Sequence, residues 1–537
     1  MAQNRSNEPK IDPAAALPVL RKNLADTEDA SFLCMIWAVH AIQDERVSQA
    51  AKFLKHPKEA ATTDIGSQYS AYKWDLETLI ALDLNTIKTA SMVRMRPLIT
   101  RDYNTVANIV NLLRAVENHE NSGRVDGTNV LLELHRIGHR QFAWQRGFVQ
   151  IRDIYRYLYI YGQGECAAYF EKSYGVSVMD FFTVAFGHFA YLTQGPWMER
   201  IANLDVFKVS QDAIDKSLNL LSGDIWMVRR ESRNLLAKFE KSLGSTLPVT
   251  YQPSYLRVKP IIRRAVGRVD RYIAPLPALI VLRATVGLYY DLQNGGTAVT
   301  NDATKRFEEY ARRSLKAHCP GFEPAPALEY TYNKNTVETP DILLNQNGRI
   351  AAVFECKATK LTFEAQYADD PAESAKNGYS QISKAIFQLW RFFSHVRRGI
   401  IEVEVAPDAP AIVLTMDAWT QVSGELRRTV VAEAEKIAAA REPDINEEDK
   451  RPPVFCPIQE LDDMLTVSNE EQLLAAFRAA TLPDYQGWSV RDVRDNAVPK
   501  LDEHKDFAFE VGELLPWWKV LRDARDAERE VAASIGV

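Results

Sequence analysis

Two acidic side chains and a lysine stand at the ends of two short apolar runs. Asp341 precedes the run 342–344, and Glu355 and Lys357 end the run that begins at Ile350. A buried charge costs on the order of several kcal/mol unless it is paired or bound to a metal. Mg²⁺ is commonly held by one or two carboxylates and leaves positions for water and substrate phosphate. We therefore expect Asp341 and Glu355 to hold a divalent cation, while Lys357 orients or deprotonates an attacking water and steadies charge on a phosphate.

A β-hairpin must bring these side chains together. An Asn-Gly pair at 347–348 separates the two apolar runs, which is typical of a hairpin turn. A plain two-residue turn would place Asp341 and Glu355 on opposite faces. A three-residue loop, Gln346–Gly348 with its last residue left-handed, would pair Asp341 with Val353 and return the charges to one face. We predict this loop or an equivalent bulge. Alternate residues of the second strand are expected to face the core: Ile350, Ala352, Phe354 and Cys356.

This stretch resembles the signature of the PD-(D/E)xK nuclease superfamily, which has the restriction-endonuclease-like fold. Pro340-Asp341 matches its first half and Glu355-Cys356-Lys357 its second, and the resemblance covers roughly residues 300–475. It implies that Asp341, Glu355 and the backbone carbonyl of Cys356 bind Mg²⁺, or Mn²⁺ in its place, and that Lys357 activates water. It also implies an α/β domain with a small mixed sheet flanked by helices, in a chain that is α+β overall.

The flanking helices supply further candidates. A helix is expected from an N-cap at Asp302 to about Lys316, with Glu308 near its inner edge. The resemblance implies that this glutamate joins the metal site. A second helix is expected at 379–397, where the resemblance implies that Gln381 reaches the catalytic site and Lys384 the nucleic acid.

Positive charge is concentrated in one part of the chain. Residues 256–320 contain 12 Lys or Arg against 5 Asp or Glu, a net charge of +7, whereas the whole chain carries −6. A basic segment beside a phosphodiesterase site would attract a polyanion, although a solvated charged surface is the alternative. The predicted nucleic-acid-binding residues are Lys305, Arg306, Lys384, Arg263, Arg264 and Arg268.

The composition of the 537-residue chain, 46% hydrophobic and 25% charged, is typical of a soluble protein with two or three domains. Five dispersed cysteines without a CxxC pair predict neither a zinc site nor disulfides, which fits a cytoplasmic location. No apolar run is long enough to suggest a membrane span. The expected divisions are a disordered tail (1–12), an all-helical domain (13–243), a basic linker with a hairpin and a helix (244–300), a nuclease domain (301–480) and a helical extension (481–537).

These patterns favour a metal-dependent nuclease, and we expect an endonuclease acting on DNA. By analogy its role would be bacterial anti-phage defence or genome maintenance, and the helical half would bind substrate, a protein partner or a second copy of the chain. One alternative is a catalytically idle nuclease fold that binds nucleic acid or acts as a scaffold. Another is an α-helical interaction module whose hairpin charges are simply solvated.

Overall fold

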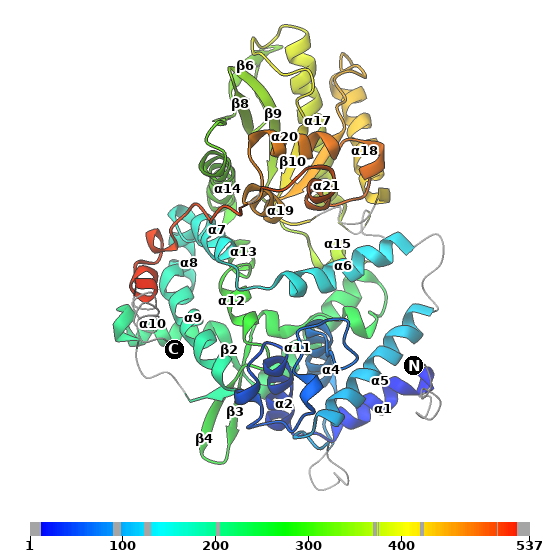
Figure 1. Cartoon of the computed structure of the whole chain (residues 1–537), viewed down its shortest axis with the longest axis vertical. Helices are drawn as coiled ribbons and strands as arrows, with labels where there is room; N and C mark the ends of the chain where they lie inside the picture. The colour runs from blue at the N-terminus through cyan, green and yellow to red at the C-terminus, as the bar shows by residue number, and fades with distance from the viewer. Residues whose placement is uncertain are drawn as a thin grey trace. The chain divides into compact units, whose positions relative to one another are not determined.

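The computed structural model describes residues 12–89, 98–122, 130–199, 204–368, 373, 375–418, 424–501 and 503–523. The chain has a mixed α+β fold (Figure 1). It forms two compact units, each made of several chain segments. The first comprises Met1–Gly127, Arg140–Val149 and Phe170–Asp291, and the second comprises Thr128–His139, Gln150–Tyr169 and Leu292–Val537.

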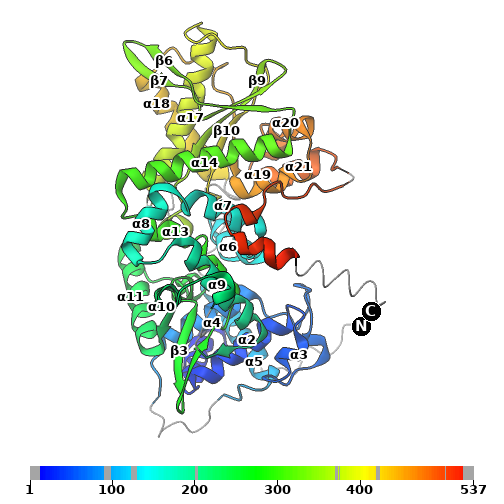
Figure 2. The ribbon, with the colours of Figure 1, turned by 90° about the vertical axis from the view of Figure 1, so that its left-hand side faces the viewer.

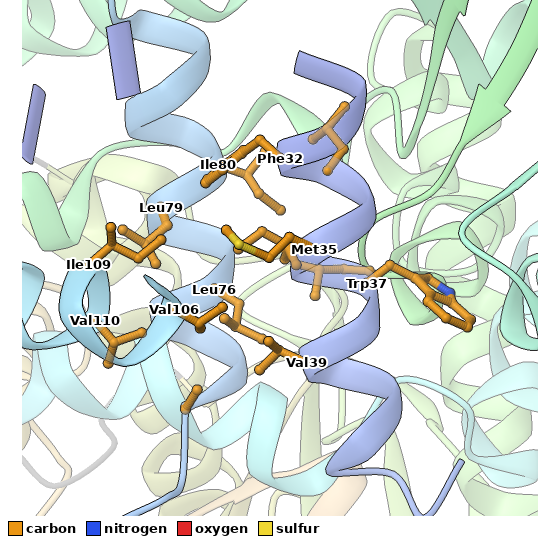
Figure 3. Packing of buried hydrophobic residues seen from close by; sticks show 14 of the residues in the cluster. Phe32, Met35, Trp37, Val39, Leu76, Leu79, Ile80, Val106, Ile109 and Val110 are labelled. Carbon is orange, nitrogen blue, oxygen red and sulfur yellow. The ribbon is translucent and has the colours of Figure 1, made fainter. Parts of the chain in front are cut away.

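The first unit is built mainly of helices around one apolar core. Helix α2 (Asp29–Ile42) is apolar on almost every side, and nearly all of its residues are buried. The Glu28 carboxylate caps this helix by accepting hydrogen bonds from two backbone N–H groups of its first turn. Figure 3 shows its side chains packing against α4 (Lys73–Asn85) and α5 (Tyr103–Ser122). Further helices of this unit are α1 (Pro13–Ala25), α3 (Val47–Ala50), α9 (Val178–Gln194), α10 (Gln211–Leu221), α11 (Ile225–Leu243) and α12 (Ala278–Ala284).

A four-stranded sheet also belongs to the first unit, with the strand order β1-β4-β3-β2. The hairpin expected in the basic segment is confirmed: β3 and β4 are antiparallel, and Gly267 between them has a left-handed φ of 65°. Strands β1 and β2 lie in the region expected to be all helical, and strands this short leave no alternation to detect in a sequence. The strands are β1 (Trp197–Met198), β2 (Ser222–Asp224), β3 (Ile261–Val266) and β4 (Val269–Ile273).

The second unit contains a five-stranded mixed sheet with the order β11-β10-β9-β8-β5. Strands β9, β10 and β11 run parallel, whereas β8 is antiparallel to both β9 and β5. A separate two-stranded ribbon, β6–β7, directly precedes Asp341. The strands are β5 (Glu323–Pro326), β6 (Glu329–Tyr332), β7 (Asn335–Glu338), β8 (Ile342–Gln346), β9 (Arg349–Lys357), β10 (Ala411–Thr415) and β11 (Pro453–Pro457).

Helices cover this sheet. Helix α17 (Lys376–Arg397) packs along β9 and β10 (Figure 2), and its apolar side chains share a core with Val353 and Val413. On the opposite face Phe354 contacts Phe477 of α20 (Glu470–Ala479) edge to face. The helices of this unit include α7 (Ile151–Tyr161), α14 (Gly296–His318), α15 (Phe363–Tyr367), α17 (Lys376–Arg397), α18 (Gly424–Arg441), α19 (Ile458–Leu465), α20 (Glu470–Ala479) and α21 (Val490–Ala497). Helices α6 (Val130–Arg146), α8 (Gly164–Tyr174) and α13 (Leu288–Leu292) contribute residues to both units.

Both faces of β9 are buried in the core. The expectation that only the face with Phe354 would be buried is therefore wrong. The strand is buried from Ile350 to Cys356, because α17 covers the face that Glu355 shares with Val353. Glu355 therefore has only 2% of its surface exposed. A carboxylate in such a position needs a compensating partner.

The β8–β9 hairpin contains a bulge in place of the predicted three-residue loop. Asn347 and Gly348 form a two-residue turn with φ values of 52° and 79°, as expected of a primed hairpin turn. The register then shifts between Leu344 and Asn345, which leaves Ala351 as the extra residue of β9. Ile342 pairs with Phe354, so the same register continued by one residue sets Asp341 opposite Glu355. The prediction of a three-residue loop was therefore wrong, whereas the alternative prediction of an equivalent bulge is confirmed.

Other expected elements were close to those observed. The helix at 379–397 corresponds to α17, but α14 begins at Gly296, ahead of the predicted start. Asp302 is not an N-cap, because it lies inside α14 and pairs with Arg306, with 3.0 Å between Nε and Oδ1. Within the described residues, no single helix combines the length and apolar character of a membrane span, although α8 and α9 meet that test as a bent pair.

Candidate active site

Asp341 is fixed at the entrance to β8 by a backbone hydrogen bond. The Cys356 amide of β9 donates to its Oδ2 at 2.6 Å. The N–H and C=O of one residue in an antiparallel ladder face the same neighbour, so the Cys356 carbonyl is directed toward this edge as well. Burial raises the pKa of Asp341, while the Cys356 amide and the charge of Lys357 partly offset that increase. The carboxylate is thus held firmly but is only partly compensated.

Glu355 and Lys357 form an ion pair near the carboxyl end of β9. Lys357 Nζ donates to Glu355 Oε1 at 2.8 Å. The second oxygen, Oε2, is buried and has no hydrogen-bond partner among the described residues. Because a buried unpaired acceptor costs about 1–3 kcal/mol or more, this oxygen is where an additional ligand would be stabilising. The structure therefore places a half-satisfied buried carboxylate beside Asp341.

Glu308 of α14 is the third acidic member of the cluster. Its pKa is raised to about 7 by burial and next by the negative charge of Asp341. Glu355 shows the same effect, with its pKa raised to about 7 by burial first, against the attraction of Lys357. The cluster therefore consists of three carboxyl groups whose charge is offset by Lys357 and, at Glu308, also by Arg312.

Lys357 remains protonated in this environment. Burial opposes its charge, but the negative charge of Glu355 and the hydrogen bond to it outweigh burial and raise the pKa of Lys357. A second hydrogen-bond partner comes from α17, since Lys357 Nζ also donates to Oε1 of Gln388 at 3.4 Å. Gln388 was not among the predicted catalytic residues. The helical spacing that links it to Gln381 could have indicated it, because the two lie two turns apart on one stripe.

The structure brings together only some of the predicted residues. Asp341, Glu355, Lys357 and Glu308 form the cluster, whereas Gln381 is exposed and Gln388 contacts Lys357. Lys384 is half-buried one turn from Gln388, and Lys305 is exposed one turn from Glu308. Arg306 pairs with Asp302. Arg263, Arg264 and Arg268 lie on or between β3 and β4, in the first unit, so the basic segment is divided between the two units.

The donor set of this cluster suits a hard divalent cation. In the part of the chain that the structure describes, no three His, Cys, Asp or Glu side chains are arranged to hold a metal ion. Mg²⁺ does not require three, because it commonly binds through one or two carboxylates and keeps several waters. The Oε2 of Glu355, the Asp341 carboxylate and the Cys356 carbonyl are oxygen donors of the required kind.

Comparisons of the chain with protein-family models, with curated protein sequences and with solved structures found no match.

Proposed function

We propose that this protein is a metal-dependent nuclease with a restriction-endonuclease-like domain in its second unit. The observation that carries the proposal is the buried Glu355 carboxylate, whose Oε2 has no partner among the described residues while Asp341 and Glu308 crowd the same site. Three carboxyl groups around the buried Glu355 are costly to bring together without a cation, because Lys357 and, at Glu308, Arg312 offset their charge only in part. The bulged hairpin supports the proposal, because it sets Asp341 opposite Glu355.

Asp341, Glu355 and the Cys356 carbonyl would hold the cation, with Glu308 at its edge. A bound Mg²⁺ would supply charge stabilisation for the phosphodiester and a more acidic water. In the reaction, a water oxygen bonds to phosphorus, the bond from phosphorus to the leaving oxygen breaks, and the products are a phosphate monoester and an alcohol. This hydrolysis requires no further reactant.

Lys357 would orient the water and stabilise negative charge on the phosphate. Its raised pKa keeps it charged at neutral pH, so it donates hydrogen bonds and does not act as the proton acceptor. Gln388 would hold its ammonium group in place from α17. Lys305 and Lys384 would contact the flanking phosphates, because they lie one turn from Glu308 and Gln388. DNA is the substrate that we favour.

Cleavage assays test this proposal directly. The full chain would be incubated with plasmid, single-stranded DNA and RNA, with Mg²⁺ or Mn²⁺ or with chelator. We expect metal-dependent cleavage that Asp341→Asn and Lys357→Met each reduce at least about 100-fold, the range for losing a group that stabilises transition-state charge. Asp484→Asn is a matched control, because Pro483-Asp484 is an exposed Pro-Asp pair without a following ExK strand.

Cleavage that is equal in wild type and Lys357→Met would rule out this site. Metal binding by the wild-type chain, measured by calorimetry with Mn²⁺, provides a second readout that does not depend on the correct substrate. Binding of nucleic acid without cleavage in any metal would favour the idle nuclease fold.

A further inference from the structure

An arginine pair on the sheet of the first unit is only partly compensated by the described residues. In the β3–β4 ladder, Arg264 stands directly opposite Arg271. Directly opposed residues project from the same face of a sheet, and like charges in such a pair are destabilising. The fold therefore maintains two positive charges side by side where an uncharged pair would be more stable.

The surrounding groups satisfy these arginines only in part. The carboxylate that approaches Arg264 is that of Glu28, at 3.8 Å, and the same carboxylate already caps α2. The Nε atoms of both Arg264 and Arg271 are buried and lack a hydrogen-bond partner among the described residues. Asp270 projects from the other face, because it pairs with Ala265 in the ladder. An anion is the ligand that would complete both guanidinium groups.

Each arginine also lies over a tryptophan. The guanidinium carbon of Arg271 is 4.0 Å from the centroid of the Trp197 ring, and that of Arg264 is 6.0 Å from the centroid of Trp226. Trp226 lies in the first turn of α11 with 65% of its surface exposed. A large aromatic ring left this open beside partly compensated arginines provides a flat surface on which another planar group can stack.

We propose that this face, formed by Arg264, Arg271, Trp226 and Trp197, binds single-stranded nucleic acid. The two guanidinium groups would contact backbone phosphates, whose geometry matches the guanidinium fork. An unpaired base would stack on Trp226, which a base within a duplex cannot do. An acidic peptide would use the arginines but leave Trp226 without a role. This inference goes beyond the proposed function, because it concerns the first unit and requires no cleavage.

Binding by the full chain tests the inference. Fluorescence anisotropy would be measured with a labelled oligonucleotide of about 20 nucleotides, as a single strand and as a duplex, in chelator so that no cleavage occurs. We expect the single strand to bind more tightly. Trp226→Ala should weaken that binding about fivefold or more, the effect of losing one stacked base. The double variant Arg264→Gln/Arg271→Gln should weaken binding and reduce the slope of log affinity against log salt by about 1.4, as for two lost phosphate contacts.

Arg101→Gln provides a matched control, since Arg101 is an exposed arginine of the first unit that lies in a turn outside the four-stranded sheet. It should change affinity less than twofold. The double variant should also keep or raise the melting temperature, because it removes a like-charge pair. Unchanged affinity in the double variant, or equal binding of single strand and duplex that Trp226→Ala does not alter, would overturn the inference. A chain that binds here in chelator but cleaves nothing would leave this inference standing while the proposed nuclease function fails.

Discussion

The backbone amide of Cys356 donates a 2.6 Å hydrogen bond to Oδ2 of Asp341. This bond joins the residue before β8 to the residue between Glu355 and Lys357 on β9. It exists because the bulge at Ala351 shifts the hairpin register by one residue. The position of Asp341 relative to Glu355 therefore depends on one extra residue several positions away.

Inserting one alanine directly after Ala351 should abolish cleavage by changing that register. With a single-residue bulge kept, the longer strand would set Asp341 opposite Phe354, on the face away from Glu355. We expect at least about a 100-fold loss of cleavage rate, similar to removal of a transition-state contact. Circular dichroism and a cooperative melting transition would establish that the variant folds. Deleting Ala351 is the matched control, because it removes the bulge but leaves Ile342 paired with Phe354, and it should remain active. Full activity in the folded insertion variant would show that this register does not position the site.

Mg²⁺ or Mn²⁺ should stabilise the folded chain. A ligand that binds only the folded state raises stability by about 2.7 kcal/mol at a concentration 100 times its dissociation constant. We expect the melting temperature of the second unit to increase with metal concentration in the wild type and to respond little in Asp341→Asn or Glu355→Gln. Asp484→Asn should behave as wild type. An equal increase in all four proteins would place the bound metal elsewhere.

Stability should depend on pH through Glu355. In the folded chain its pKa is raised to about 7, against an ordinary value of 4.5. The side chain is protonated in both folded and unfolded states below pH 4.5, and above pH 7 the folded state bears the cost of a buried charge. Glu355 therefore lowers the free energy of unfolding as the pH rises from 4.5 to 7.

Glu355→Gln should remove this dependence. Chemical denaturation in chelator would give the free energy of unfolding at about pH 5 and about pH 8. We expect the wild type to lose about 1–3 kcal/mol more than the variant over this range. Asp462 also has a raised pKa, but it is common to both proteins and cancels in the comparison. Glu308 does not cancel, because its negative charge helps to raise the pKa of Glu355 and its effect is part of the difference that is measured. Identical slopes for the two proteins would contradict the raised pKa of Glu355.

Local sequence patterns predicted much of the second unit. The apolar runs and the Asn-Gly pair located β8 and β9, and helical spacing located α17, because each of these elements has a strong local signal. The start of α14 was missed because Asp302, a favourable N-cap residue, is instead used inside the helix to pair with Arg306. The bulge at Ala351 was foreseen only through a chemical requirement, that Asp341 and Glu355 share a face.

Several features of the first unit could not be predicted from local sequence patterns. Its sheet joins β1 and β2 of the helical region to the β3–β4 hairpin, through pairings that no local pattern encodes. Linear clustering of charge also failed to indicate how the basic residues are distributed, since Arg264 and Lys305 lie in different units. The opposition of Arg264 to Arg271 is a property of the strand register and emerges only from the fold.

Two glutamines on α17, Gln381 and Gln388, are candidates for the residue that assists the catalytic site. The sequence resemblance favoured Gln381, whereas the structure places Oε1 of Gln388 3.4 Å from Lys357 Nζ and leaves Gln381 exposed. We expect Gln388→Ala to lower the cleavage rate about tenfold to 100-fold, in line with the loss of one hydrogen bond to a charged group. Gln381→Ala should change the rate less than twofold.

In the proposed mechanism Gln388 positions Lys357, so its loss should affect catalysis and not metal binding. The metal concentration that gives half-maximal rate should remain unchanged in Gln388→Ala. Gln388→Glu retains an oxygen acceptor at the same distance along the side chain and should recover part of the lost rate. If Gln381→Ala is the impaired variant and Gln388→Ala is not, the resemblance identified the correct residue, and α17 must present a different face to the site when substrate is bound.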